Sequence, residues 1–356
     1  MRHGTRAALI AAAFATASCG SVHIPKLRAP SLHVLKSKPA PAFSFVVIGD
    51  TPYSAPDAEF LNDKIVPAIR SGAYPFVIHV GDDKPGGAPC TGAFDDDQAA
   101  LIAAIKPKPV FYTPGDNEWT DCDRNPDPAT GQPTSELHRL QELRARFFSG
   151  DIDAPGGMHA KRQAAEPENQ TWVYHGVRFA TLEVVGTNNG RNEVLGDPVD
   201  AAAKAADARD ANNVIWLNQV VKSAIKEKAM ALVIAMQADM TQVGAAARGE
   251  LCTGASDDRT PTCDGYAKIV HALIAASLSY GRPILLIHGD TPPFLFSRYN
   301  WGVANLWRLN AAGDVEIDDN GVEQGVRDAT LVTVTPGAVE PFAAKALVSG
   351  AAPAAD

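Results

Sequence analysis

The sequence predicts a layered α/β architecture with mixed sheets. Early in the chain, short β-rich runs are each followed by a helical stretch. Four of the β-rich runs end at a Gly-Asp pair, so four predicted strands finish with the same chemistry. Later β-rich runs follow one another directly, as antiparallel strands do.

The predicted elements form one continuous body, residues 43–342, without an internal repeat. The strands that lead into Gly-Asp are residues 45–48, 76–80, 110–113 and 284–287. A hairpin is expected within residues 172–185, turning at His175-Gly176, and later strands are expected at residues 306–310 and 331–335. Residues 213–228 are amphipathic at the helical period, so we expect a helix that covers a sheet.

Both ends of the chain differ from this body in composition. Residues 1–19 carry Arg2 and Arg6 before an apolar run of small residues and are expected to be a signal segment. Cys19 follows small residues, as at a lipoprotein cleavage site, so export to the periplasm would end either in lipid attachment at Cys19 or in simple release. Residues 20–42 are basic and proline-bearing, which predicts a tether. The Ala-rich residues 343–356 predict a flexible tail.

The four other cysteines favour two disulfides, because an even number in an exported chain is typical of a disulfide framework. Four cysteines permit three pairings. We expect Cys252 to pair with Cys263, closing a short polar loop, and Cys90 to pair with Cys122, joining two loops. Free thiols in a reducing cytosol are the alternative.

The charge balance bears on the class of ligand. The formal net charge is −9, which argues against nucleic acid as a partner, because binding to its phosphates requires clustered Lys and Arg. A small anionic substrate remains compatible, since bound metal ions reverse the local field.

The repeated Gly-Asp pairs indicate a common site. Ligands of open α/β sheets bind beyond the carboxyl ends of the strands, where the loops converge. Glycine allows a sharp turn, and the following aspartate then projects an oxygen ligand. One such pair is an ordinary turn, but four converging carboxylates would repel one another unless a cation neutralised them. The pattern therefore predicts a divalent metal site.

The motifs GDTPY, GDDKP, GDNEW, QADM and HGDTP occur in that order over about residues 44–292. This set resembles the ordered motifs of the calcineurin-like metallophosphoesterases: Asp-x-His, Gly-Asp, Gly-Asn-His-Asp/Glu, a lone His and Gly-His-x-His. The Gly-Asp-Asn-Glu-Trp motif is similar to that of a bacterial exported branch of the family. The resemblance implies a four-layer α/β/β/α sandwich of two mixed sheets flanked by helices, and hydrolysis of a small phosphoester.

The resemblance also implies roles for individual residues. Asp50 matches the first ligand, Asp82 the carboxylate that bridges two metals, and Asp116 a ligand Asn. Asn117 stands where the family has the His that assists the leaving group. Gln237 replaces the lone ligand His and Asp290 a His of the last motif, while Pro52 and Pro292 stand at two further His positions.

The implied ligand set contains no imidazole. Its hard oxygen ligands suit one or two Mn²⁺, Mg²⁺ or Ca²⁺ ions better than Zn²⁺, which prefers nitrogen and sulfur. Glu118 is expected to orient its neighbours rather than bind metal. Tyr53 is either a further oxygen near the site or a packed aromatic of the loop.

Two histidines and the segment that carries Asn188 to Arg191 offer further candidate site residues. His288 directly follows a strand, so it either binds metal or protonates a leaving group, or is a buried structural histidine. The same choice applies to His79. Asn188 and Asn189 either line the crevice as substrate-binding donors or form a turn, and Arg191 is the nearest cation for a phosphate oxygen.

Two functions follow from these residues. The first is metal-dependent hydrolysis of phosphoesters outside the cytoplasm, with a preference for good leaving groups because Asn117 cannot donate a proton as imidazolium does. The alternative is a catalytically impaired protein on the same scaffold, which binds a metal or ligand without turnover.

Overall fold

The computed structural model describes residues 40–299, 301–317 and 320–355. The predicted signal segment, Cys19 and most of the predicted tether lie outside the described residues. Among the described residues, no helix combines the length and the apolar character needed to cross a membrane.

The first sheet has five strands and is mixed. Its order is β14 (Phe342–Ala346), β13 (Thr330–Val334), β1 (Phe43–Ile48), β2 (Val77–His79) and β3 (Val110–Tyr112). β1, β2 and β3 are parallel, and β13 is antiparallel to both β1 and β14. In β1, Val46 packs against helices and Val47 packs against the second sheet. A strand covered on both faces needs such consecutive apolar residues.

The second sheet has seven strands and is also mixed. Its order is β4 (Lys161–Arg162), β5 (Gln170–Tyr174), β6 (Val177–Thr181), β7 (Ala231–Ala235), β8 (Ile284–His288), β10 (Leu306–Asn310) and β9 (Leu295–Arg298). The strands β6, β7, β8 and β10 are parallel. A separate antiparallel pair comprises β11 (Gly313–Ile317) and β12 (Glu323–Val326).

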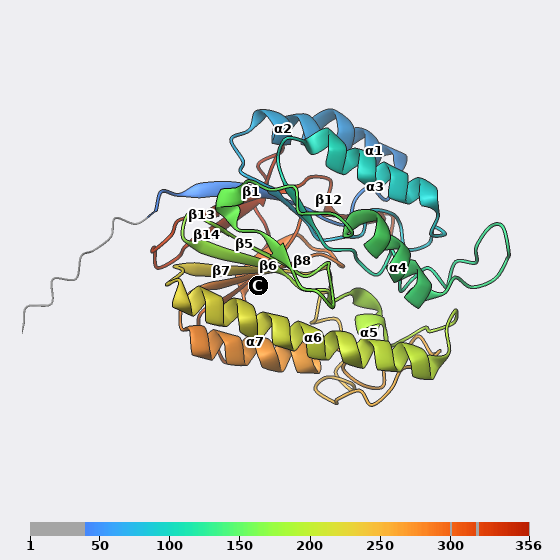
Figure 1. Ribbon diagram of the computed structural model, residues 1–356. Coiled ribbons are helices and arrows are strands. Elements are labelled where there is room, and N and C mark those ends of the chain that lie inside the picture. The colour runs from blue at the N-terminus through green and yellow to red at the C-terminus, as the bar shows by residue number, and fades with distance from the viewer. Residues whose placement is uncertain (1–39, 300, 318–319, 356) are drawn as a thin grey trace, which may run out of the picture. The chain divides into compact units, whose positions relative to one another are not determined.

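Helices cover the outer faces of both sheets, which gives four layers (Figure 1). The first sheet is covered by α1 (Ala55–Phe60), a π-helical turn (Leu61–Ile65), α2 (Val66–Ser71) and α3 (Gly92–Ile105). The second sheet is covered by α6 (Val199–Lys226) and α7 (Ala267–Tyr280). Connections contain α4 (Glu136–Phe147), a 3-10 turn (Gly156–Met158) and α5 (Gly186–Gly190).

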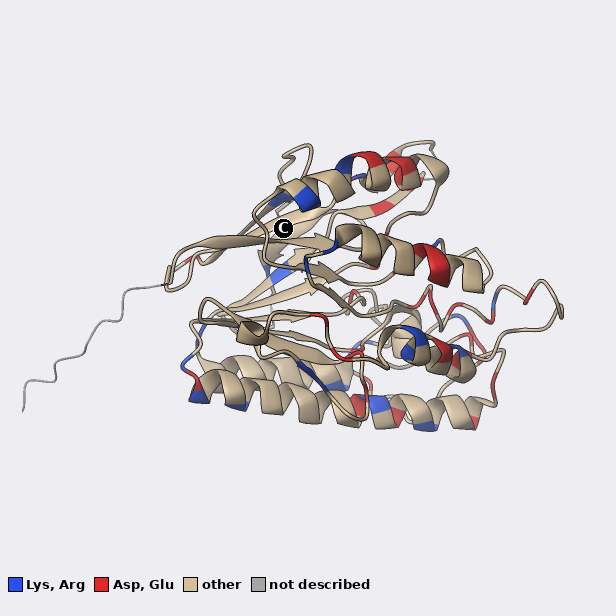
Figure 2. Cartoon of the chain, turned by 45° about the horizontal axis from the view of Figure 1, so that its top comes forward, with Lys and Arg blue, Asp and Glu red and all other residues tan. Residues whose placement is uncertain are grey.

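The core between the two sheets is rich in aromatic residues. Phe111 stacks on Trp172 with ring centroids 3.5 Å apart, and Phe76 packs edge-on against Phe179. Because apolar side chains fill the spaces between the layers, charged residues lie mainly on helices and loops, as Figure 2 shows.

The predicted α/β class, the two mixed sheets and the strands that lead into Gly-Asp are confirmed. The hairpin between β5 and β6 turns at His175-Gly176, and both residues have positive φ. The predicted helix at 213–228 is part of α6, which begins fourteen residues earlier, at Val199. The Ala-rich start of α6 has high helix propensity and buries Ala202 and Ala206.

The prediction of a flexible tail over residues 343–356 is wrong in part. Residues 343–346 lie in β14, whose Phe342 and Ala346 are buried between the sheets. Near the end of the chain, Ala354 forms a backbone bridge with Leu295. The tail is ordered because β13 offers it an unpaired edge, which the composition of the tail does not reveal.

Candidate metal centre

The predicted aspartates come from the carboxyl ends of strands in both sheets. Asp50 follows β1, Asp82 follows β2, Asp116 follows β3 and Asp290 follows β8. Asp82, Asp116 and Asp290 line an open cleft with a volume of about 620 Å³. The two stacked sheets therefore bring together residues that are more than 200 positions apart.

Three of these aspartates form a compact group. One carboxylate oxygen each from Asp82, Asp116 and Asp290 lies within 4.8 Å of the others. Asp50 adjoins the group, because its Oδ1 accepts a hydrogen bond of 2.7 Å from the backbone N–H of Asp290. Asp50 itself is not among the three residues that meet this spacing.

The backbone at the site is unusual. Asp50, Asp82 and Asp290 have φ values of 54°, 57° and 80°, in the left-handed region that most residues avoid. Such strain is retained where the surrounding structure enforces it, and it is common at functional sites. Glycine is also required here: a Cβ on Gly115 would overlap Asp82 Oδ1, and one on Gly289 would overlap Asp50 Oδ2.

Glu118 fixes the loops that carry two of these aspartates. Its buried carboxylate accepts hydrogen bonds from the backbone N–H groups of Gly115 at 2.5 Å, Asp82 at 2.9 Å and Asp83 at 2.7 Å. These donors belong to the turns after β2 and β3. The prediction that Glu118 orients its neighbours is therefore confirmed.

Gln237 does not have the predicted role of an oxygen ligand. Its Oε1 accepts a hydrogen bond of 2.6 Å from the backbone N–H of Gly186. Its amide nitrogen points into the aspartate group, with Nε2 at 3.1 Å from Asp82, 2.9 Å from Asp116 and 3.0 Å from Asp290. An amide NH₂ has no lone pair free for a metal, so Gln237 is a donor to the carboxylates.

Burial and mutual repulsion make the negative charges of this group costly. Burial is the main factor that raises the pKa of Asp82, and the nearby Asp116 carboxylate raises it further. Burial and Asp116 likewise raise the pKa of Asp290, and burial followed by Asp314 raises the pKa of Asp50. Such a group needs protons or a cation for compensation.

A divalent cation fits the chemistry of the group. All three of the closely spaced residues offer carboxylate oxygens, which are the ligands preferred by Mg²⁺, Mn²⁺ and Ca²⁺. The three oxygens are close enough to share one ion at the usual ligand distances of about 2.0–2.6 Å. The predicted ligands Asp82, Asp116 and Asp290 are thus brought together.

Asn117 and Tyr53 line the cleft beside this group. The amide nitrogen of Asn117 donates to the Tyr53 hydroxyl at 3.2 Å, and that hydroxyl donates to Asp82 Oδ2 at 3.1 Å. Burial raises the pKa of Tyr53 further above its usual value, so its proton stays on the oxygen. Tyr53 is therefore part of the site rather than a packed aromatic alone.

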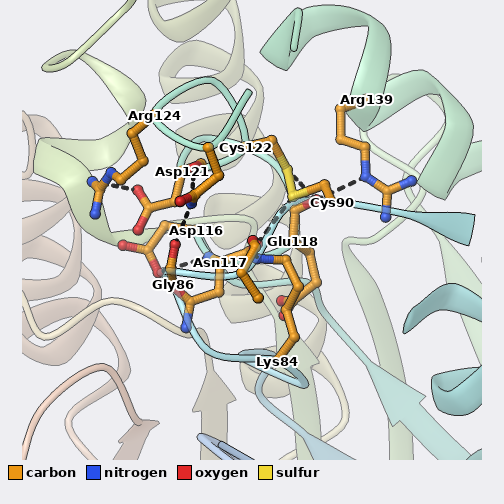
Figure 3. Close-up of a disulfide and its surroundings, with 12 residues drawn as sticks. Lys84, Gly86, Cys90, Asp116, Asn117, Glu118, Asp121, Cys122, Arg124 and Arg139 are labelled. Atoms are coloured by element: carbon orange, nitrogen blue, oxygen red, sulfur yellow. Dashed lines mark hydrogen bonds and ion pairs between the residues drawn. A yellow bond between two sulfur atoms is a disulfide. The ribbon is translucent and has the colours of Figure 1, made fainter. Parts of the chain in front are cut away.

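The disulfide between Cys90 and Cys122 supports one wall of the cleft (Figure 3). It joins the loop after Asp82 to the loop that carries Asp116 and Asn117, as the sequence predicts. The second predicted disulfide, between Cys252 and Cys263, is also present. Two disulfides fit a protein that is exported to an oxidising compartment.

The predicted catalytic role of His288 is not supported. The side chain is fully buried and does not line the cleft. Its Nε2 accepts a hydrogen bond of 2.8 Å from Arg308, so Nδ1 carries the proton and donates to the Gly289 carbonyl at 2.8 Å. Burial lowers the pKa of His288, which keeps it neutral. His288 and Arg308 instead support the turn before Asp290.

His79 is buried as well, and burial lowers its pKa to about 3. Its Nδ1 accepts a hydrogen bond from the backbone N–H of Gly81 at 3.1 Å. Both histidines thus have the structural role that the sequence left open.

The predicted substrate-binding residues mostly point away from the cleft. Asn189 donates to Asp210 on α6 at 2.8 Å, and Arg191 forms ion pairs with Asp207 and Asp210. Asn188 lines the cleft, but its amide nitrogen donates to Asn192 and the Cys263 carbonyl. The segment turns because residues 187–189 all have positive φ, which directs these side chains inward.

Several site residues were not predicted. Arg124 pairs with Asp121 and Glu193, each at 2.6 Å, and Thr187 lies 3.2 Å from Asp116. Asp121 follows the GDNEW motif by only two residues, so the motif was a usable signal for it. Arg124 and Thr187 had no such signal, because their positions depend on tertiary contacts.

The loop closed by Cys252 and Cys263 forms part of the rim and carries Arg259 into the cleft. Backbone bonds from Val194 to Ser256 and from Glu193 to Asp258 join this loop to the segment after α5. The Arg259 side chain is 82% exposed, and its nearest acid is Glu193 at 3.8 Å. The cleft therefore has an accessible cation at its rim.

Comparisons with known proteins leave the family open. No protein-family model matches the sequence, and no curated protein matches it. Among solved structures, the chain is similar to "GAP50 the anchor in the inner membrane complex of Plasmodium". The identity is 9%, the alignment covers 87% of this chain and 86% of that chain, and the TM-score is 0.46. A likeness at this level does not bear on function.

Proposed function

We propose that this protein is a divalent-cation-dependent phosphoesterase of the calcineurin-like type that acts outside the cytoplasm. The observation that carries the proposal is the convergence of Asp82, Asp116 and Asp290, with ligand atoms within 4.8 Å of one another, in an open cleft. Buried carboxylates held this close destabilise a fold unless a cation or protons compensate them.

In this proposal Asp82, Asp116 and Asp290 hold the cation, and Asp50 adjoins it. Mn²⁺, Mg²⁺ or Ca²⁺ is favoured over Zn²⁺ by the oxygen donors. When bound, such an ion supplies Lewis-acid stabilisation of phosphoryl oxygens and a more acidic water.

Residues of the cleft wall act on the substrate. The Asn117 amide donates one hydrogen to Tyr53 and has a second hydrogen for a phosphoryl oxygen, and Arg259 adds positive charge at the rim. Asn117 does not release a proton, and His288 is buried outside the cleft. Because losing a general acid typically costs about 10²–10⁴ in rate, we expect substrates with good leaving groups, such as aryl phosphates.

The test is hydrolysis of an aryl phosphate monoester and diester by chelator-treated protein resupplied with Mn²⁺, Mg²⁺, Ca²⁺ or Zn²⁺. Asp82→Asn should abolish metal-dependent turnover, while Asp97→Asn, on the exposed face of α3, should retain it. Equal turnover by both variants would reject the assignment of the site.

A second candidate function is binding of a cation or anionic ligand without turnover. It is favoured by the absence of a titrating acid at Asn117 and by the donor role of Gln237. Metal binding that depends on Asp82 but gives no hydrolysis with either ester would select this function.

A further inference from the structure

Gln237 lies at the centre of the site in a position that conflicts with a bound cation. Its Nε2 is between 2.9 and 3.1 Å from oxygens of Asp82, Asp116 and Asp290. These three residues are the ones whose oxygens are spaced for one ion. Because the Nε2 atom lies about 3 Å from all three carboxylates, it occupies the space needed by an ion that approaches each of them to about 2.0–2.6 Å.

The orientation of the amide is fixed by a neighbour outside the group. The backbone N–H of Gly186 donates to Oε1 of Gln237, so the other end of the amide must be the NH₂. Gln237 is fully buried at the end of β7. The NH₂ is therefore held among the carboxylates by a main-chain contact and by burial.

We propose that the Gln237 amide and a divalent cation are alternative occupants of the aspartate group. In the metal-free protein the NH₂ hydrogen-bonds the carboxylates and stabilises the fold. A cation binds to Asp82, Asp116 and Asp290 when the amide moves aside, so Gln237 lowers metal affinity. This inference rests on the cation site of the proposed function, but it does not require hydrolysis.

The hydrogen count supports this competition. An amide NH₂ has two hydrogens, whereas three carboxylates surround it. The amide therefore cannot donate a full hydrogen bond to all three carboxylates at once, and an ion with two positive charges can replace it. The cost of replacement is the loss of hydrogen bonds to charged groups, which are stronger than neutral ones.

The matched variant is Gln237→Glu, which keeps the oxygen that accepts from Gly186 and replaces the NH₂ with a ligand oxygen. Gln242→Glu introduces the same charge change on an exposed residue that also lines the cleft, so it controls for the added negative field. Gln237→Ala removes the amide without adding charge.

The experiment is calorimetric titration of Mn²⁺ into each chelator-treated protein, together with thermal melting with and without Mn²⁺. We expect Gln237→Glu to bind Mn²⁺ at least about tenfold more tightly than wild type, which corresponds to ~1.4 kcal/mol. Its metal-free form should melt at a lower temperature, and Mn²⁺ should raise that temperature by more than in wild type. Gln237→Ala should shift in the same directions, and Gln242→Glu should resemble wild type.

The outcomes separate this inference from the proposed function. Equal Mn²⁺ affinity in wild type and Gln237→Glu, or an equal gain in Gln242→Glu, overturns the inference alone. Tighter Mn²⁺ binding by Gln237→Glu, together with no hydrolysis of aryl phosphates by the wild-type protein, supports the inference and rejects the esterase. Failure of every variant and of wild type to bind Mn²⁺ overturns both.

Discussion

Replacement of Glu118 by Ala tests how the two central loops are held. The substitution removes the acceptor for the backbone N–H groups of Gly115, Asp82 and Asp83, all within 2.9 Å of the carboxylate. A buried donor left without a partner costs about 1–3 kcal/mol. Three such donors at the lower limit give a loss of at least about 3 kcal/mol, which is large against a typical total stability of about 5–15 kcal/mol.

The assay is urea unfolding followed by circular dichroism, with Glu59→Ala as the control. Glu59 lies on the exposed side of α1, so this matched substitution should change stability by no more than about 0.5 kcal/mol. Glu118→Gln keeps one carbonyl acceptor and should fall between wild type and Glu118→Ala. A loss below about 1 kcal/mol for Glu118→Ala would refute the reasoning, because the loops would then not depend on this acceptor.

Three further predictions concern pH, a disulfide and the rim of the cleft. Burial raises the pKa of Glu136 to about 11, so the folded state retains a proton that the unfolded state loses near the ordinary glutamate pKa of 4.5. The contribution of this group to the unfolding free energy therefore falls as pH rises above that value. Glu136→Gln mimics the protonated acid, so in urea unfolding it should gain stability relative to wild type between pH 5 and pH 9. A stability difference between variant and wild type that is the same at both pH values would contradict this. Replacing Cys252 and Cys263 together by Ser opens an 11-residue separation and should lower the unfolding free energy by about 3 kcal/mol in the same assay, whereas no loss would show that the loop is held by its other contacts. Arg259→Ala should raise KM for an aryl phosphate monoester about two- to fivefold with little effect on kcat, while the exposed Arg70→Ala should not; equal KM values would exclude Arg259 from substrate binding.

The sequence predicts the ligand-bearing loops well because their signal is local. A buried strand followed by Gly-Asp fixes both the position of the aspartate and the direction of the loop. Parallel strands then bring their carboxyl ends to one edge, so the meeting of Asp82 and Asp116 follows from topology. The pairing of Cys90 with Cys122 is predictable for a related reason, since both cysteines lie on these loops.

The orientation of individual side chains is not predictable in this way. His288 and Asp290 are two residues apart, yet only Asp290 lines the cleft, because the turn through Gly289 gives Asp290 a positive φ. Arg191 is drawn to Asp207 and Asp210 on α6, which is a tertiary contact without a local pattern. For Gln237, the backbone N–H of Gly186 is the donor that determines which end of the amide faces the aspartates, and these two residues are 51 positions apart.

The central claim is that Asp82, Asp116 and Asp290 bind one divalent cation. The most direct test is anomalous X-ray diffraction from crystals of the mature protein soaked in Mn²⁺. We predict an anomalous peak within ligand distance of all three carboxylates, with the Gln237 amide displaced from the position it has here. A fully occupied Mn²⁺ site elsewhere, with these aspartates still bonded to the Gln237 amide, would contradict the account.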